Sequence, residues 1–284
     1  MAAYDLALQN FAVAEHLLQL FELFQGLHEG EANNDLRLVV CKNWGIPETT
    51  SIRNAYNEQL FIVAKTCAPI PQALLVENGS DFLLRQAVVV SCTSLESFFW
   101  DSLRENVLTI VRARKRGADE SLREIKLTLD DYLSLENYAD SNERLKEIIL
   151  KNFERQTLYD TKSIEKIADI LTVKDFWDTI SHRSGMPIGD IQRSLNELIK
   201  RRNQITHRAD RPASDASPPD EQDGHGLRAI SYAWVNTRVS TAKSVVNAAN
   251  EAFSKAIQRL ERQLAQKEEQ ALAQQTLKTH VNEK

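Results

Sequence analysis

Arg202, Asn203 and His207 are the residues whose types and spacing best suit a chemical reaction. A histidine can accept or donate a proton near neutral pH, and an arginine keeps its positive charge and can hold a phosphate. Cleavage of RNA needs proton transfer at an oxygen and stabilisation of the extra negative charge that develops on the phosphate. The sequence therefore predicts Arg202 and His207 as catalytic residues, with Asn203 assigned to orientation.

The spacing alone carries little information. With six histidines and this arginine content, about one arginine lying five to seven residues before a histidine is expected by chance. Asn203, directly after Arg202, makes a chance match rarer, and the segment lies where an amphipathic helix ends before a loop rich in Pro, Asp and Ser. This context, more than the spacing, favours a functional site.

Helical geometry gives the three residues different directions. On a helix that advances about 100° per residue, Arg202 falls in one band with apolar residues, where an arginine is costly unless it meets an acid, a ligand or a partner. The band holds Ile191, Leu195, Leu198, Arg202 and Ile205. His207 lies about 140° from Arg202 but about 40° from Asn203. Close contact between Arg202 and His207 on one straight helix is therefore awkward, as expected if a second chain or a distorted helix end completes the site.

The segment Arg202-Asn203-Gln204-Ile205-Thr206-His207 resembles the HEPN superfamily. Ribonucleases of that superfamily carry an Arg, a polar residue that is often Asn, then three to five residues and a His. Residues 191–208, with the earlier helix at 85–100, are similar in particular to the RiboL-PSP-HEPN branch, and the resemblance covers about residues 80–260.

The resemblance implies an all-α fold and a homodimer in which both motifs face one cleft. It also implies a metal-independent endoribonuclease that leaves 2′,3′-cyclic phosphate and 5′-hydroxyl ends, and a toxin or antiviral defence protein as the biological setting. RNA would be the substrate, and an antitoxin or another protein of the defence system is a possible partner.

Further site residues are expected around the motif. Glu96 matches a position where relatives often carry an acid, and it could pair with Arg202 or help to orient His207. Arg201 and Arg208, seven residues apart on one helix face, could extend a phosphate-binding surface, or they could be solvated. A basic run could contact RNA, or it could complement the dipole at a helix C-terminus; it comprises Arg112, Arg114, Lys115 and Arg116.

Two other functions are compatible with the same residues. A HEPN protein that binds RNA, nucleotide or protein without cutting would act as a sensor or scaffold. A toxin that is modified by a partner nucleotidyltransferase is disfavoured, because such toxins resemble a motif with Tyr two residues after His, where this chain has Ala209.

Composition limits the remaining possibilities. A formal charge of −5 argues against bulk attraction to nucleic acid, so RNA contact requires a local basic patch. The three cysteines lie far apart without CxxC spacing, which favours a reducing compartment. Residues 1–27 lack the apolar block of a signal peptide or membrane span, so we expect a cytoplasmic protein with no membrane contact. No sequence pattern suggests a metal or another cofactor.

The elements that must position the site are mostly helical. The periodicity predicts a helix up to about Leu27, a strand-like run from Leu36 to Trp44, and a helix from about residue 49 to Cys67. A long central helix follows at 81–111, and shorter helices are predicted near 129–135, 141–153 and 163–180. The motif helix is expected at 191–207, a mobile loop at 209–228, and a long helix from about 230.

The predicted architecture is an all-α HEPN-type helical bundle with an additional N-terminal helical segment and a long C-terminal helix. Residues 1–80 form an N-terminal extension that packs on the bundle, 81–265 the HEPN-like domain, and 266–284 a polar, frayed tail. The near-heptad pattern from Val246 to Leu264 is compatible with a dimer interface or with the core of one chain.

Overall fold

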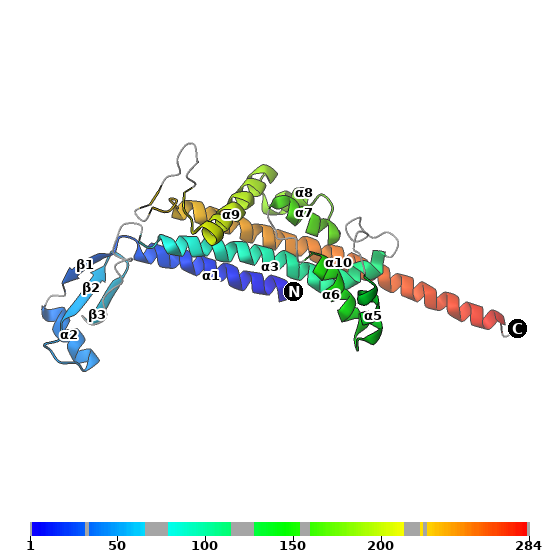
Figure 1. The fold of residues 1–284 in the computed structure, drawn as a ribbon, viewed down its shortest axis with the longest axis horizontal. Coiled ribbons are helices and arrows are strands. Elements are labelled where there is room, and N and C mark those ends of the chain that lie inside the picture. Colours follow the sequence, from blue (N-terminus) through cyan, green and yellow to red (C-terminus); the bar gives the residue numbers. More distant parts are fainter. Residues whose placement is uncertain are drawn as a thin grey trace. The chain divides into compact units, whose positions relative to one another are not determined.

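The computed structural model describes residues 2–31, 34–65, 79–114, 128–153, 160–212, 222–223 and 226–282. Figure 1 shows that helices dominate, as predicted for an all-α fold, with one small sheet. The chain divides into two compact units. Unit 1 contains residues 1–10, 92–200 and 240–284, and unit 2 contains residues 11–91 and 201–239.

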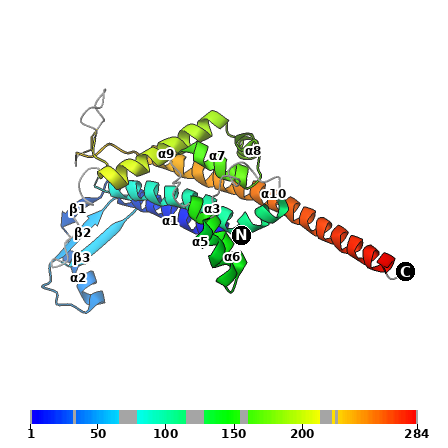
Figure 2. The same ribbon diagram turned by 45° about the vertical axis from the view of Figure 1, so that its right-hand side comes forward.

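Unit 1 is a helical bundle built around parts of α3 (Asp81–Arg114) and α10 (Tyr232–Asn282). The two helices lie side by side in Figures 1 and 2. The central helix predicted at 81–111 is confirmed. It carries a buried apolar stripe, none of whose members is more than 2% exposed: Leu84, Val88, Cys92, Leu95, Phe99 and Leu103. By length and composition α3 could span a membrane, but 61% of its most apolar window is buried within the protein.

An aromatic cluster fixes α3, α8 (Phe176–Ser184) and α10 together in unit 1. The ring of Phe253 on α10 stacks on Phe98 at 6.0 Å and on Phe176 at 6.1 Å between centroids, and meets Phe99 edge-on at 5.8 Å. Val246, Ile257 and Leu260 of the near-heptad pattern are also at most 8% exposed. This part of the pattern therefore belongs to the core of one chain.

The remaining helical parts of unit 1 are the start of α1 (Ala2–Phe24), α5 (Leu129–Asn137), α6 (Ser141–Phe153), α7 (Thr161–Ile170) and part of α9 (Ile188–Arg208). The single helix predicted at 163–180 is wrong, because two helices, α7 and α8, occupy this region. Thr172 and Asp175 between them have positive φ angles of 71° and 51°, which an α-helix does not contain. The C-terminal tail, predicted to fray, continues α10 to Asn282.

Unit 2 contains the end of α1 (Ala2–Phe24), α2 (Asn34–Trp44) and a three-stranded antiparallel sheet. The strand order is β1 (His28–Glu31), β2 (Ile52–Tyr56) and β3 (Phe61–Lys65), visible in Figure 2. Leu27 and Ala55 form its small core with Phe24, Leu60 and Ile62. The predicted N-terminal helical extension, residues 1–80, therefore contains a three-stranded sheet in addition to α1 and α2.

Two predictions in this region fail for identifiable reasons. The run Leu36 to Trp44 is helix α2, because Leu36, Val40 and Cys41 turn inward at helical spacing and Gly45, with φ 62°, ends the helix. The helix predicted at 49–67 is a β-hairpin. Its turn is set by Asn57, whose Oδ1 accepts hydrogen bonds from the amides of Gln59 and Leu60 at 2.9 and 2.7 Å. The predicted end at Cys67 lies outside the described residues.

Candidate functional site

Helix α9 carries the predicted catalytic residues in its last turns. Its apolar face is buried as predicted, with Ile191, Leu195 and Leu198 each at 0% exposure. Arg202 and Ile205, which continue the same band, are half-buried. Residues 188–200 belong to unit 1 and residues 201–208 to unit 2, so the whole motif from Arg201 to Arg208 lies within unit 2.

The motif residues differ in exposure. His207 is exposed to solvent, whereas Arg202 and Asn203 are half-buried. The segment remains an α-helix through Arg208, and the Thr206 hydroxyl donates a hydrogen bond to the carbonyl oxygen of Arg202 at 2.9 Å. Regular geometry therefore keeps His207 about 140° around the helix from Arg202 and about 40° from Asn203. The helix end is not distorted within the motif.

The two arginines predicted to flank the site have different surroundings. Arg208 is exposed, as a phosphate-binding surface requires. Arg201 instead points into the protein and is only 14% exposed. Its Nη2 donates to Asp210 Oδ2 at 2.8 Å and to the carbonyl oxygens of Arg228 and Ala229 at 2.9 and 3.2 Å. These contacts stabilise the fold, whereas the sequence suggested that Arg201 could extend a phosphate-binding surface.

Asp210 lies at the centre of a buried ion-pair network in unit 2. Its side chain is 1% exposed, and Oδ2 accepts hydrogen bonds from Arg201 and, at 2.7 Å, from Arg85 Nε. Arg85 also donates through Nη2 to Asp223 Oδ2 at 2.6 Å and to the Arg228 carbonyl oxygen at 3.0 Å. Burial lowers the pKa of Arg201, and the charge of Asp210 opposes this shift. The network joins the start of α3, the end of α9 and the segment before α10.

The sequence alone did not identify this network. Asp210 and Asp223 fall in the stretch 209–228, whose composition predicts a mobile loop, and Arg85 belongs to the predicted central helix without being part of a motif. The described ends of that stretch are held by hydrogen bonds, whereas residues 213–221 and 224–225 lie outside the described residues. One signal was available: Arg85 is a charged residue at the apolar start of a core helix, where it requires a counterion.

The α9 helix ends in two residues with left-handed backbone, Ala209 at φ 49° and Asp210 at φ 59°. Alanine is strained there, by roughly 1–2 kcal/mol, because its Cβ approaches the following carbonyl. We expect Ala209→Gly to raise the free energy of unfolding by about 0.5–1 kcal/mol, after the entropic cost of glycine is subtracted. Chemical denaturation measures the change, and Ala12→Gly within α1 is the control that should lose stability.

Glu96 lies in unit 1, on α3, and so belongs to the other compact unit from the motif. It lines a groove of about 310 Å³ together with Trp100, Arg104 and Leu150. The proposed pairing of Glu96 with Arg202 stays a prediction.

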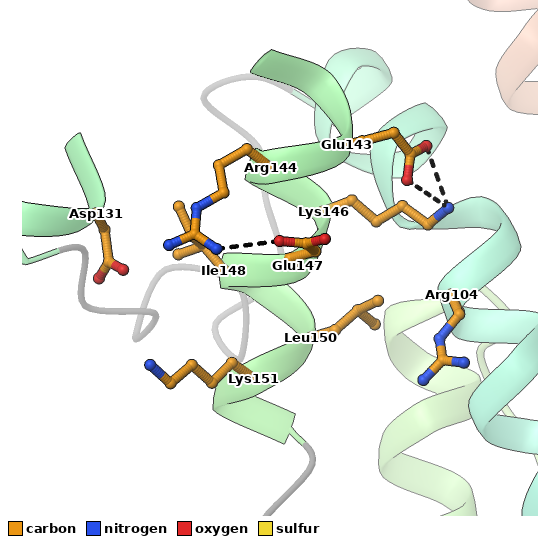
Figure 3. Close-up of a pocket in the computed structure, with 9 residues that line it drawn as sticks. All are labelled: Arg104, Asp131, Glu143, Arg144, Lys146, Glu147, Ile148, Leu150 and Lys151. Atoms are coloured by element: carbon orange, nitrogen blue, oxygen red, sulfur yellow. Dashed lines mark hydrogen bonds and ion pairs between the residues drawn. The ribbon is translucent and has the colours of Figure 1, made fainter. Parts of the chain in front are cut away.

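Arg104 also borders a second groove, of about 440 Å³, along α5 and α6 (Figure 3). Figure 3 shows that two basic side chains of this groove form ion pairs within α6: Arg144 pairs with Glu147 at 3.0 Å and Lys146 with Glu143 at 3.3 Å. The residues lining this groove include no histidine. The groove therefore offers mixed charge and no group for proton transfer near neutral pH.

The predicted basic run at the end of α3 is only partly described. Arg112 donates from Nη2 to Asn142 Oδ1 on α6 at 2.8 Å. The side chain of Arg114, and Lys115 and Arg116 entirely, lie outside the described residues. RNA contact by this run stays a prediction. Within the described part of the chain, no group of three or more His, Cys, Asp or Glu side chains could hold a metal ion.

Comparison with known proteins gives one match. The RiboL-PSP-HEPN family model matches residues 55–255, which include the motif, the aromatic cluster and the Arg85–Asp210 network. The match begins within β2, earlier than the boundary at residue 80 expected from the sequence. Searches of the curated proteins and of the solved structures each found no significant match.

Proposed function

The chain belongs to the RiboL-PSP-HEPN family, and from this premise we propose that it is a metal-independent endoribonuclease. Membership by itself indicates an RNA-related function, either nuclease-like or binding. The observation that supports cleavage is that the last turns of one helix carry both a solvent-exposed His207 and a half-buried Arg202. An exposed imidazole can reach an RNA backbone and exchange protons with it.

In the proposed reaction the 2′-hydroxyl oxygen of a ribose attacks the adjacent phosphorus, and the bond from phosphorus to the 5′-oxygen breaks. His207 removes the proton from the 2′-hydroxyl or delivers a proton to the departing 5′-oxygen. Arg202 stabilises the additional negative charge on the phosphorane, since its guanidinium stays protonated and can donate two parallel hydrogen bonds. The products carry a 2′,3′-cyclic phosphate and a 5′-hydroxyl.

We further propose that the active site is completed by a second copy of the chain. Arg202 and His207 stand about 140° apart on a helix that stays regular, so one copy cannot readily direct both at one phosphate. In a symmetric dimer each helix presents the same residues to one shared cleft. Arg208, exposed at the same helix end, would extend the surface that binds the RNA backbone. A role as toxin or defence effector in the cytoplasm, restrained by a partner protein, fits this activity.

The test is incubation of the purified full chain with total RNA in EDTA, followed by analysis of the fragment ends. We expect fragments with cyclic phosphate and 5′-hydroxyl ends, because no step in the mechanism requires a metal ion. A chain that binds RNA tightly but leaves it intact under these conditions would instead be a non-catalytic sensor or scaffold. Cleavage that appears only when Mg²⁺ is restored would contradict the proposed mechanism.

A further inference from the structure

The two adjacent arginines of the motif have separate tasks, and Arg201 contacts a buried carboxylate that lies close to His207 in the sequence. Arg201 contacts Asp210 and two backbone carbonyl oxygens, whereas Arg202 remains half-buried at the site. Asp210 lies three residues after His207 and is 1% exposed. A carboxylate buried this deeply is stable only with charged partners, which Arg85 and Arg201 provide.

The backbone around Asp210 closes the turn that holds His207. The amide of Asp210 donates to the Gln204 carbonyl oxygen at 3.0 Å, a bond that spans six residues and encloses His207. Its own carbonyl oxygen accepts from the Arg228 amide at 3.0 Å. Ala209 and Asp210 both have positive φ angles, so the chain reverses at this point. Asp210 thus fixes the helix end through its side chain and through both of its backbone polar groups.

We infer that Asp210 is a positioning residue for His207, an inference that rests on the proposed function. The Asp210 carboxylate, held between Arg85 and Arg201, anchors the last turn of α9, so that the exposed imidazole keeps one direction toward the RNA. Without the anchor, the end of an exposed helix frays and the imidazole samples several directions. Misplacement of a reacting group by about 1 Å can cost about 100-fold in rate. Arg201 acts here as the counterion of Asp210.

Asp210→Asn and Asp223→Asn form a matched pair of variants. Both carboxylates are buried and both accept a hydrogen bond from Arg85, but only Asp210 lies at the end of α9. At a temperature where circular dichroism finds both variants folded, we expect Asp210→Asn to lower kcat for RNA cleavage by about 10–100-fold, with KM within about twofold of wild type. Asp223→Asn should keep kcat within about threefold of wild type.

Hydrogen exchange measures the anchor directly and does not depend on activity. Amides of residues 205–210 should exchange at least about tenfold faster in Asp210→Asn, while those of 205–210 in Asp223→Asn and of α3 in both variants should be nearly unchanged. If wild type does not cleave RNA, the proposed function fails, and this exchange pattern alone decides whether Asp210 fixes the turn of His207.

Two results would overturn the inference. The first is a kcat of folded Asp210→Asn that equals the wild-type value. The second is an equal loss of kcat in both variants, which would mean that the network supports the fold in general and not His207 in particular. Should Asp210→Asn fail to fold, Arg201→Lys replaces it, because lysine keeps the charge but cannot reproduce the planar set of bonds to Asp210, Arg228 and Ala229. We expect Arg201→Lys to lower kcat at least about fivefold at unchanged KM, and an unchanged kcat contradicts the inference.

Discussion

His207→Ala is expected to lower kcat for RNA cleavage by about 10²–10⁴-fold, because it removes the group that transfers the proton. RNA binding should persist, since the alanine leaves Arg202 and Arg208 in place. His182→Ala is the matched control: His182 is also at the C-terminal end of a helix, α8, and lines a groove with Arg183 and Glu251, but no arginine precedes it at the motif spacing. Steady-state cleavage of a short RNA, with binding measured by anisotropy, gives both quantities.

Equal activity of His207→Ala and wild type would reject His207 as the catalytic residue. A loss in His182→Ala as large as in His207→Ala would move the candidate site to α8. Arg202→Ala should lose about 10²–10³-fold in kcat, the usual effect of removing one group that stabilises an anionic transition state. Circular dichroism of each variant separates loss of chemistry from loss of fold.

The proposed shared site allows a test by complementation. If Arg202 of one copy acts with His207 of the other, a mixed dimer of the two alanine variants contains one intact pair and one doubly altered pair. Random assembly makes about half of the dimers mixed, and each mixed dimer has one intact site out of two. Co-expression should therefore recover up to about a quarter of wild-type activity. Recovery that stays at the level of the separate variants would place both residues of the pair on the same copy.

The helices that form the core were predictable because their apolar residues repeat at helical spacing. In α3 and α9 the buried face follows this repeat closely, so both the elements and the inward stripe agree with the structure. Residues 34–65 were not predictable in this way. A short β-branched run near Val39 favours a strand, yet α2 forms because a single inward face packs there. The Asn57 turn that forms the hairpin depends on one side chain.

The residues that hold the candidate site in place were not predictable from the sequence, for another reason. Arg85 and Asp210 are 125 residues apart, and no local pattern relates them. The stretch after α9 has the composition of a mobile loop, and this composition gives no indication that two of its carboxylates are buried. Local sequence thus identified the residues proposed for the chemistry, while the residues that hold them became evident only from contacts between distant segments.

The core position of Phe253 leads to the second large expected effect. The near-heptad pattern on α10 allowed two interpretations, and the contacts of Phe253 with Phe98, Phe99 and Phe176 assign it to the interior of one chain. Its side chain is 4% exposed, so Phe253→Ala removes a large buried ring and leaves a cavity in the core. We expect the free energy of unfolding to fall by about 3–5 kcal/mol.

Protein concentration distinguishes a core residue from an interface residue. Loss of core packing lowers stability equally at every concentration, whereas loss of a dimer contact weakens association and makes the apparent Tm depend more steeply on concentration. Thermal unfolding of Phe253→Ala over a hundredfold range of concentration should therefore give a Tm lowered by a constant amount. Gln258→Ala, at an exposed position of α10, should leave Tm nearly unchanged. A Phe253→Ala chain that keeps wild-type stability as a monomer but no longer self-associates would assign this face of α10 to the dimer.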